Sequence, residues 1–349
     1  MTSHSAGFEV REIDLDTLTA DELDQVVALA NLIAAEREPR HSDFSTEEFL
    51  VFSRIPGSIR HRYAVFDDAS GLAAYAELRY RDDGSNAEML RVAIGVDPAH
   101  RRKGIARAFL EKALELAREL GRTRMAGETF DTVPASKALA TTVGAEGKLD
   151  FHANALRVQD LDLDLLRGWV SDGPRRAEGY SVRIVEGMYP DELLEGMAHL
   201  YHVLERDMPT PEGHEPRIYS PEFVTEMIGQ YLAVSEALTA VAVHDESGAV
   251  AGMSQLARRH HDPSTWIVST TMVDPEHRGH ALGKWLKAAV NLEALERWPG
   301  AVWEETGNAF TNDAMLGINH AMGFRHEFTM TEVHVDVETV ERYLGNRSS

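Results

Sequence analysis

Two short segments of the chain combine a basic turn with small residues in a pattern that suits a bound phosphate. The first is HRRKGIA, residues 100–106, which follows a strand-like run that ends at Asp97-Pro98. The second is HRGHALG, residues 277–283, which follows a similar run that ends at Asp274-Pro275. Small side chains let the backbone approach a ligand closely. We therefore expect each turn to present backbone N–H groups to an anion.

Each turn precedes a segment with the pattern of an amphipathic helix. After the first turn, Phe109, Leu110, Ala113, Leu114 and Ala117 recur at three- and four-residue spacing. The N–H groups of a helix's first turn lack partners within the helix, and the helix dipole favours negative charge there. A dinucleotide-binding turn would need Gly-x-Gly-x-x-Gly, which neither segment has. The pattern therefore indicates a phosphate or pyrophosphate site of another class.

The two turns occupy equivalent positions of an internal repeat. Pro98 and Pro275 are 177 residues apart (275 − 98), and the similarity extends outward on both sides of them. Segments 64–81 and 242–259 both read as a strand, an Asp/Ser/Gly turn and a second strand. Each repeat reads in the order strand, helical region, three strands, helix, strand, helix, strand. We therefore expect an α/β fold with a mixed sheet, present twice.

The repeat predicts two domains of similar size. We expect an N-terminal domain over residues 1–170 and a C-terminal domain over residues 180–349, joined by a Gly/Pro-containing polar linker at 171–179. The helical regions are expected at residues 17–52 and 190–232. Two domains also suit the chain length of 349 residues.

The second repeat contains an added segment with the sequence DMPTPEGHEPRIYSP, residues 207–221. Its four prolines exclude a continuous helix, because proline removes a backbone donor and restricts the residue before it. A long loop within a compact domain is often a binding loop or lid. A functional loop and an insertion without function both stay open from the sequence.

Composition excludes several classes of protein and site. The absence of cysteine excludes disulfides, cysteine-bound metal and a cysteine nucleophile. No apolar run approaches the roughly 20 residues of a membrane span, and the first residues have no signal-peptide pattern, so we expect a cytoplasmic protein. A formal net charge of −22 argues against nucleic acid binding and leans mildly toward a cationic small-molecule partner. We expect no metal site.

The turns resemble the signature of the Gcn5-related N-acetyltransferase (GNAT) family, which is Arg/Gln-x-x-Gly-x-Gly/Ala between a strand and a helix. The first turn fits this signature fully with Arg101, Gly104 and Ala106. The second turn departs at one position, where Ala281 replaces glycine. The resemblance covers most of each repeat and its order of elements, and it implies two tandem GNAT acyltransferase domains.

The resemblance implies that the turns hold the pyrophosphate of acetyl-CoA, while the strand after each motif splays away to admit the pantetheine arm. The residues implied in cofactor binding are Val96, Arg101, Arg102, Lys103, Gly104, Ile105 and Ala106 in the first repeat, and Val273, Arg278, Gly279, His280, Ala281, Leu282, Gly283, Asn308 and Asn312 in the second.

The family's general acid is a tyrosine that lies seven residues after an asparagine and shortly before a Gly-Phe pair. The second repeat has Asn312 and Gly323-Phe324 at the family spacing, but Asn319 stands at the tyrosine position. The first repeat has Val133 and Ala140 at the two positions. Asparagine can donate a hydrogen bond to the thioester sulfur or to water but cannot supply a proton. We therefore expect catalysis in the C-terminal repeat, while the N-terminal repeat binds coenzyme A or nothing.

Without cysteine, the acetyl group must pass directly to an amine in a ternary complex. A free alkylamine has a pKa near ~10.4, as lysine does, so a carboxylate is expected to accept its proton. Glu304 and Glu305, on the strand after the second motif helix, are the candidates. Adjacent strand residues face opposite sides, so at most one of them points into the cleft.

The resemblance thus implies an acetyl-CoA-dependent N-acetyltransferase whose acceptor is the primary amine of a small molecule. We expect a monomer or homodimer, with neither nucleic acid nor a membrane as partner. The alternative is a non-catalytic acyl-CoA-binding module that senses or regulates, and the missing tyrosine in both repeats supports it.

Overall fold

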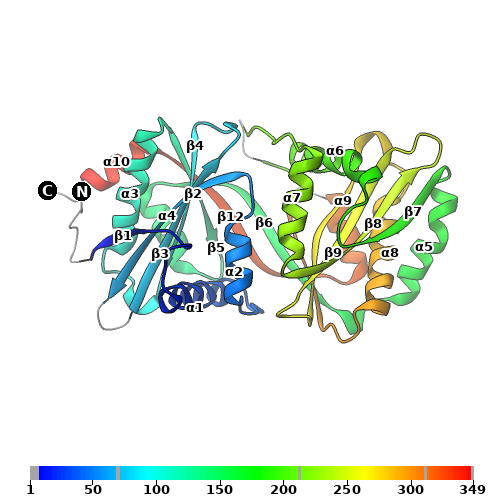
Figure 1. Ribbon diagram of the computed structural model, residues 1–349, viewed down its shortest axis with the longest axis horizontal. Helices are drawn as coiled ribbons and strands as arrows, with labels where there is room; N and C mark the ends of the chain where they lie inside the picture. Colours follow the sequence, from blue (N-terminus) through cyan, green and yellow to red (C-terminus); the bar gives the residue numbers. More distant parts are fainter. Residues whose placement is uncertain (1–7, 68–70, 211–213, 310–312, 347–349) are drawn as a thin grey trace.

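The strands of the protein form one continuous sheet. The computed structural model describes residues 8–67, 71–210, 214–309 and 313–346. Within them twelve strands lie in the order β1-β2-β3-β4-β5-β12-β6-β11-β10-β9-β8-β7, and the molecule is elongated along this order (Figure 1). Only β4 with β5 and β10 with β11 run parallel. The expected mixed α/β fold is therefore confirmed.

Both repeats have the element order that the sequence predicts. The first repeat consists of β1 (Val10–Ile13), α1 (Ala20–Arg37), α2 (Thr46–Ser53), β2 (Ser58–Asp67), β3 (Gly71–Arg81), β4 (Met89–Val96), α3 (Ile105–Glu119), β5 (Arg124–Phe130), α4 (Pro134–Val143), β6 (Glu146–Arg157) and α5 (Leu163–Arg176). The second consists of β7 (Tyr180–Glu186), α6 (Asp191–Asp207), α7 (Pro221–Leu232), β8 (Ser235–His244), β9 (Val250–Arg259), β10 (Thr265–Val273), α8 (Leu282–Arg297), β11 (Trp303–Ala309), α9 (Asp313–Met322), β12 (Arg325–Asp336) and α10 (Val337–Gly345).

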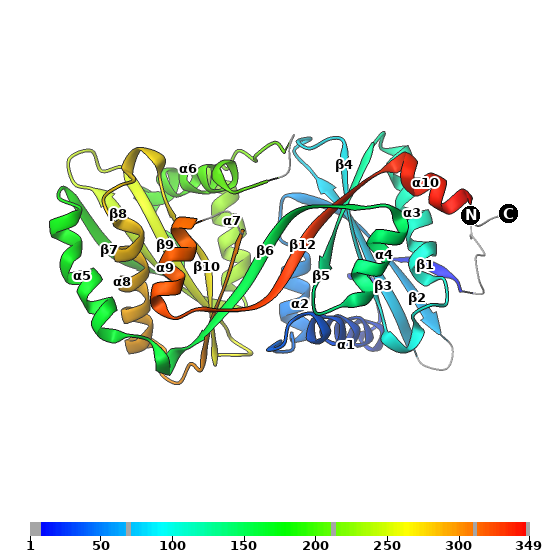
Figure 2. The ribbon, with the colours of Figure 1, turned by 180° about the vertical axis from the view of Figure 1, so that it is seen from behind.

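Helices cover both faces of the sheet. Figure 1 shows α1, α2, α6 and α7 on one face, and Figure 2 shows α3, α4, α8 and α9 on the other. The first two helices start at capping boxes, in which Thr19 pairs with Glu22 and Ser45 with Glu48. Helix α3 buries Phe109 and its apolar neighbours against β3 and β4, as its three- and four-residue spacing predicts.

The two repeats exchange their last strands. Strand β6 of the first repeat pairs with β11 of the second, and β12 of the second repeat pairs with β5 of the first. The helix after each exchanged strand follows it, so α5 packs on α8 and α10 packs on α3. Figure 2 shows β6 and β12 crossing between the halves.

The molecule therefore consists of two spatial units that differ from the sequence repeats. The first unit contains residues 8–145 with β12 and α10, and the second contains β6 and α5 with residues 180–322. The expected domain boundaries, 1–170 and 180–349, follow the sequence repeats. The spatial units differ from them because each unit contains the last strand and helix of the other repeat.

The expected linker at residues 171–179 is wrong over most of its length, because α5 continues to Arg176. Gly173 is buried, and a Cβ atom there would collide with the ring of Trp285. Its glycine therefore permits close packing of α5 on α8, and Pro174 lies in the last turn of the helix. The glycine and proline that are typical of a linker therefore lie within α5, where the glycine allows the contact with α8.

The two units also contact each other through ion pairs of equivalent arginines at the ends of β3 and β9. Arg81 of the first unit forms an ion pair with Glu205 of α6 at 2.6 Å. Arg259 of the second unit lies 3.4 Å from the buried Glu48 of α2. Because α2 also packs against α7, the faces of the two units that carry these helices are turned toward each other (Figure 1).

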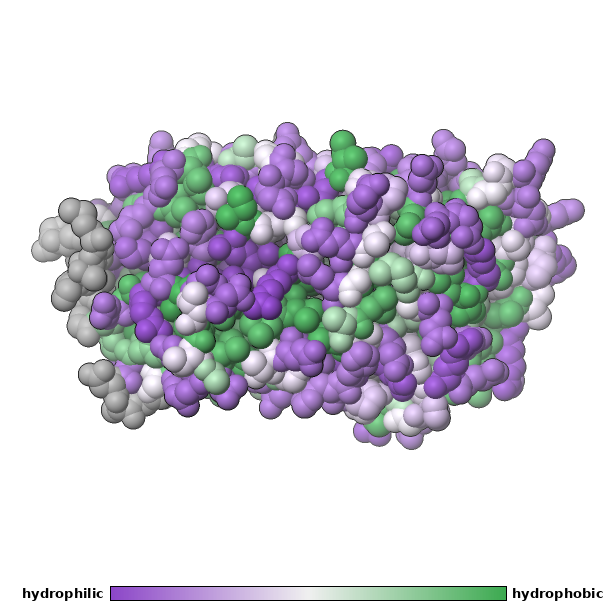
Figure 3. Space-filling view, viewed as in Figure 1, coloured by the Kyte–Doolittle hydropathy of each residue, from purple (hydrophilic) through white to green (hydrophobic). Residues whose placement is uncertain are grey.

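The surface is mainly hydrophilic, in keeping with the net charge of −22, and apolar residues form separate patches on the face seen in Figure 3. None of the helices over the described ranges is both long and apolar enough to span a membrane.

The strand exchange predicts that a substitution near the C-terminus loosens a helix more than 200 residues earlier. Leu344 is buried in the first unit's core with α3. We expect Leu344→Ala to lower the free energy of unfolding by about 2–5 kcal/mol. Hydrogen exchange should become faster in residues 105–119 and stay unchanged in residues 282–297. The exposed Glu338→Ala on the same helix is the control, and faster exchange confined to α8 would contradict the exchanged arrangement.

Candidate functional site

The first unit contains a cavity of about 790 Å³ between two diverging strands. Strands β4 and β5 pair only where residues 89–91 meet residues 124–126, although β4 continues to Val96 and β5 to Phe130. Residues 92–96, 126–128 and 130 line the opening, together with the start of α3 and one side of α4. The β5-facing backbone of β4 beyond residue 91 has no strand partner within the described chain. A linear ligand can therefore lie along β4.

The phosphate turn of the first repeat closes one end of this cavity. Gly104 adopts the left-handed conformation (φ 91°) and precedes α3 without any side-chain cap on the helix. The next N–H groups, from Ile105 to Arg107, lack intrahelical partners, and these three residues line the cavity. All of the expected cofactor residues of this repeat line the cavity except Lys103, which is exposed.

The side chains of the motif arginines are held by hydrogen bonds and ion pairs within each unit. Arg101 donates from Nε to the carbonyl of Val96 at 3.1 Å and forms a two-pronged ion pair with Glu36 of α1. Hydrogen bonding from Arg101 lowers the pKa of Glu36. Arg278 repeats this arrangement with Val273 at 3.1 Å and with Asp207 of α6 at 2.7 Å. The anion is thus left to the backbone amides and to neighbouring cations.

The second turn has the same backbone shape with different chemistry. Ala281 holds the left-handed conformation (φ 59°) that the first repeat gives to glycine, which costs an L-residue about 1–2 kcal/mol. Tyr180 packs against His280 and bonds to His277 at 2.9 Å. Leu282, Gly279 and Gly283 complete the turn as expected.

The crevice of the second unit contains a chain of buried polar side chains. Lys287 of α8 donates to Asn319 of α9, whose amide nitrogen donates to Asn308 of β11 at 2.6 Å. One turn further along α8, Asn291 donates to Glu304 at 3.3 Å. Lys287, Glu304 and Asn291 are at most 1 % exposed. These side chains occupy the space between α8, α9 and β11.

The equivalent positions of the first unit are apolar. At the offset of 177 residues, Lys287 corresponds to Leu110, Asn291 to Leu114 and Glu304 to Gly127 (287 − 110 = 291 − 114 = 304 − 127). A Cβ atom at Gly127 would lie 3.2 Å from the carbonyl oxygen of Val92 on β4. A side chain at position 127 would therefore occupy part of the space between β4 and β5, and the glycine leaves that space open.

Glu304 and Glu305 face opposite sides of the sheet, as the strand predicts. Glu304 is fully buried, and burial raises its pKa although Lys287 opposes the rise. Burial in turn lowers the pKa of Lys287. Glu305 lies on the α6/α7 face, 3.5 Å from Arg40 of the first unit, and burial raises its pKa as well.

The remaining expected residues of the second site are only partly accounted for. The amide group of Asn319 is engaged at both ends, by Lys287 and by Asn308. Asn312 lies outside the described residues. The sequence predicted catalysis in the C-terminal repeat, with coenzyme A or nothing bound by the N-terminal repeat. The structure gives both turns the same backbone shape, and it places buried polar side chains beside β11 of the second unit.

Charged side chains line the first unit's cavity on the face that α1 covers. Glu128 and Glu332 are directly opposite on β5 and β12, and Arg91 of β4 contacts them at 3.4 Å and 3.2 Å. His334 bonds to Glu332 at 2.7 Å. Although burial opposes it, His334 and Arg91 lower the pKa of Glu332 to about 2. Glu332 is therefore a fixed anion, and Glu128 lies where β4 and β5 separate.

A smaller cavity of about 120 Å³ lies beyond this cluster, away from the phosphate turn. Arg79 and Arg91 line both cavities, so the two cavities meet at these residues. The wall of the smaller cavity also includes His334 of the exchanged strand and His214 of the second repeat.

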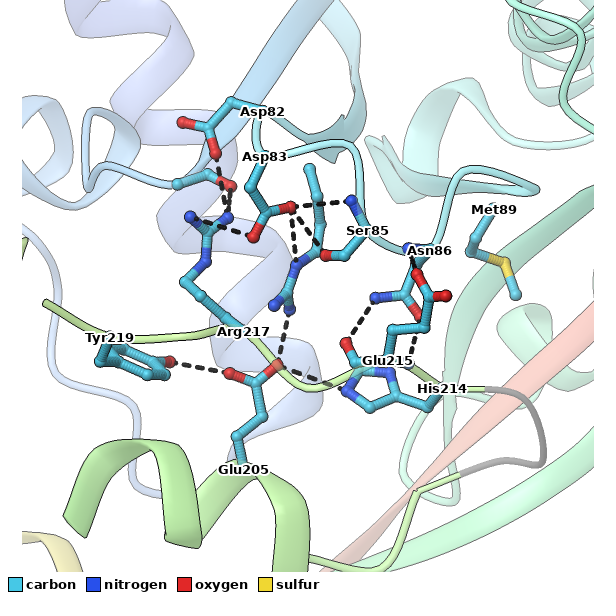
Figure 4. Close-up of polar contacts among 12 residues, drawn as sticks. Asp82, Asp83, Ser85, Asn86, Met89, Glu205, His214, Glu215, Arg217 and Tyr219 are labelled. Atoms are coloured by element: carbon cyan, nitrogen blue, oxygen red, sulfur yellow. Dashed lines mark hydrogen bonds and ion pairs between the residues drawn. The ribbon is translucent and has the colours of Figure 1, made fainter. Parts of the chain in front are cut away.

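The proline-containing loop of the second repeat contacts the first unit through Glu215 and Arg217 (Figure 4). The backbone and side chain of Asn86 form three hydrogen bonds of 2.9 Å with Glu215. Arg217 reaches Asp82 at 3.0 Å and Asp83 at 3.4 Å. These contacts hold His214 beside the smaller cavity, and they support the functional-loop interpretation.

Sequence reasoning missed the residues that the second repeat contributes to the first unit, Glu332, His334 and His214. No local sequence pattern in those segments indicates that they lie in the first unit. Arg79 carried a signal, because Glu77, Arg79 and Arg81 alternate with apolar residues along β3, but the pattern does not say which face holds a ligand. Arg91 is the one charged residue of β4.

Comparisons with known proteins agree with this geometry. The model of the acetyltransferase (GNAT) family matches residues 26–145 and 197–316. No curated protein matches the chain. A tandem GNAT protein from the clavulanic acid biosynthesis pathway, solved without AcCoA, has a similar structure with a TM-score of 0.77 and 24% identity over 95% of this chain and 98% of that chain.

Two further structures share the fold at lower identity. A GCN5-related N-acetyltransferase from Sphaerobacter thermophilus has a TM-score of 0.63 and 15% identity over 95% of this chain and 96% of that chain. A GCN5-related glucosamine N-acetyltransferase region of a fungal multi-domain GH3 β-N-acetylglucosaminidase has a TM-score of 0.62 and 16% identity over 95% of this chain and 38% of that chain. At these identities the likenesses show the fold alone.

The buried ion pair of the second unit predicts a pH-dependent loss of stability. Lys287→Met leaves Glu304 buried without a cation, which costs about 3–5 kcal/mol when the carboxyl is charged. Burial raises the pKa of Glu304 to about 7, and loss of Lys287 raises it further. A carboxyl with a raised pKa loses its stabilising contribution as the pH rises through that value. Chemical unfolding should therefore show a larger loss at pH 8.5 than at pH 6.

Two further variants control this experiment. Lys284→Met, at an exposed position one turn earlier on α8, should leave stability nearly unchanged at both pH values. Adding Glu304→Gln to Lys287→Met should remove the pH dependence, because no ionisable carboxyl is then buried. An equal loss at both pH values for Lys287→Met would contradict the buried pair.

Proposed function

The chain belongs to the acetyltransferase (GNAT) family and is an acyltransferase, and we propose that its first unit transfers an acetyl group from acetyl-CoA to the primary amine of a small molecule. The observation that carries this proposal is the cavity of about 790 Å³, which extends from the phosphate turn to Glu128 and Arg91.

The phosphate end of the cavity suits the diphosphate of coenzyme A. Unpaired amides of α3 lie beside Arg102 and Arg107, which also line the cavity. Tyr343 of the exchanged α10 adds to the wall there, with its ring 6.0 Å from the guanidinium of Arg107. The second turn offers His280 in place of Lys103, and its left-handed position is an alanine. These differences support the first unit as the main binding site.

The pantetheine arm would follow the unpaired edge of β4 and bring the thioester to the point where β4 and β5 separate. The neutral amine attacks the thioester carbonyl carbon, an amide bond forms, and the C–S bond breaks to release coenzyme A. Positioning of the two reactants supplies much of the rate. No tyrosine stands at position 140, so the thiolate leaves without that acid.

Glu128 is proposed as the proton acceptor. It occupies the position of the first repeat that corresponds to Glu305, and it lines the cavity on the α1 face. Glu332 is less suited, because its low pKa makes it a weak base. For the second unit, Glu305 is the better-placed of the two sequence candidates, since Glu304 is enclosed with Lys287 and Asn291.

A charge introduced into each turn tests which unit holds the cofactor. Ala106→Glu places a carboxylate at the first turn of α3, where the helix dipole favours its folding but the charge repels a diphosphate. We expect the Kd for acetyl-CoA, measured by calorimetry, to rise by about 100-fold or more, because like-charge juxtaposition costs several kcal/mol.

Gly283→Glu is the matched variant at the equivalent position of α8 and should change the Kd by less than about threefold if binding is confined to the first unit. A loss of binding with Gly283→Glu and not with Ala106→Glu would transfer the site to the second unit. Absence of any binding by the unchanged protein would overturn the transferase proposal.

A second pair of variants tests the proton acceptor. Glu128→Gln should lower kcat by about 10²–10⁴-fold, the usual contribution of general base catalysis, with little change in the Kd for acetyl-CoA. Glu305→Gln is the matched control. The measurement is thiol release over a library of primary amines from pH 6 to 9. The opposite result, in which only Glu305→Gln slows turnover, would assign the base to the second unit.

A further inference from the structure

A row of three arginines crosses the sheet beside the site. Arg79 of β3 is directly opposite Arg60 of β2 on one side and Arg91 of β4 on the other. Residues directly opposite in antiparallel strands share one face, and like charges in such pairs are destabilising. The row lies on the face that α1 and α2 cover. Anionic groups beside the row would offset the repulsion between the arginines.

The two outer arginines have such partners. Arg60 lies 3.6 Å from Glu77 and donates to the carbonyls of Ile55 and Ser58. Arg91 contacts Glu128 and Glu332 at 3.4 Å and 3.2 Å.

The other arginines at the smaller cavity are paired as well. Arg81 forms its ion pair with Glu205 at 2.6 Å, and Arg124 forms one with Glu88 at 2.7 Å. Among these arginines, only Arg79 has a guanidinium group without a hydrogen bond or ion pair to any residue of the described chain. It is only partly exposed, and it lies between two cationic neighbours.

Arg79 also stands at the junction of the two cavities. It lines both the larger cavity, which extends to the phosphate turn, and the smaller one on the opposite side. A ligand that enters from the smaller cavity meets the end of a ligand that lies along β4 at Arg79 and Arg91. Glu128, which accepts from Arg91, is at the same meeting point.

Resting on the proposed function, we propose that Arg79 binds an anionic group, most simply a carboxylate, on the acceptor itself. The acceptor is then a small molecule that carries both a primary amine and a carboxylate, as amino acids and their derivatives do. A guanidinium can bind a carboxylate through two parallel hydrogen bonds, which fixes the direction of the ligand as well as its charge. The amine would then point toward Glu128.

The second repeat limits the size of this acceptor. His214 lines the smaller cavity from the loop that Asn86 and Arg217 anchor to the first unit (Figure 4). His334 lines it from the exchanged strand β12. These side chains enclose a cavity of about 120 Å³, which suits a compact acceptor and not a protein chain.

The test compares matched pairs of amines that differ only in the carboxylate, such as alanine with ethylamine, phenylalanine with phenethylamine and lysine with 1,5-diaminopentane, within a panel of all twenty amino acids. Binding to the protein saturated with coenzyme A is measured by calorimetry, which needs no turnover. Thiol release from acetyl-CoA is measured in parallel. The variants are Arg79→Met and Arg79→Lys, with Arg183→Met, on an exposed strand position of the second unit, as the control.

We expect the unchanged protein to prefer the carboxylate-bearing member of at least one pair by about 10- to 100-fold, the usual worth of a hydrogen bond to a charged group. Arg79→Met should abolish this preference through KM or Kd, Arg79→Lys should keep part of it, and Arg183→Met should keep all of it. Binding of acetyl-CoA should be unchanged in every variant.

The outcomes separate this inference from the proposed function. Carboxylate-dependent binding that needs Arg79 but is not followed by thiol release would support the acceptor site and overturn the transfer reaction. Transfer without a carboxylate preference, or with a preference that survives in Arg79→Met, would overturn the acceptor site and leave the transfer reaction in place. Failure of every amino acid to bind at millimolar concentration would also overturn it.

Discussion

Two strands cross between the halves of the molecule, and the first unit's site is incomplete without this exchange. Strand β12 covers the edge of β5 and brings Glu332 and His334 to the face where Arg91 lies. Helix α10 follows it and closes the core over α3, the helix whose start forms the phosphate turn. Backbone hydrogen bonding thus fixes the position of residues that lie about 200 positions away in the sequence. The tandem arrangement is part of the site's construction and not merely a doubling of it.

The two units show how equivalent crevices can diverge while the backbone stays the same. In the first unit, the equivalent leucines are buried in the apolar core, and Gly127 lines the cavity between β4 and β5. In the second, Lys287, Asn291 and Glu304 form a buried polar group at the same positions. Removing two charges from water is costly unless they are paired and hydrogen-bonded. The pair is therefore retained together, since the loss of either member leaves an uncompensated buried charge.

The elements and the phosphate turns could be predicted from the sequence because their signals are local. The spacing of apolar residues gave the helices, and small residues after Asp97-Pro98 gave the turn. The strand exchange could not be predicted, because the same pattern fits a strand that returns to its own repeat. The linker was misjudged for a related reason: only the position of Trp285 explains Gly173. The acceptor site that we propose could not be predicted, because the arginine row forms only when β2, β3 and β4 pair and bring Arg79 between Arg60 and Arg91.

The net charge of −22 and the arginine row favour ligands of opposite charge, but they act over different distances. Exposed charges are largely screened beyond a Debye length of about 8 Å at physiological ionic strength. Within a part-buried cavity, the charges of the lining residues determine the local potential. Most of these charges are paired there, whereas the guanidinium groups of Arg102, at the phosphate turn, and Arg79, at the junction with the smaller cavity, have no ion pair within the described residues. The overall acidity therefore acts at long range, whereas the acceptor site that we propose at Arg79 depends on the local charges of the cavity wall.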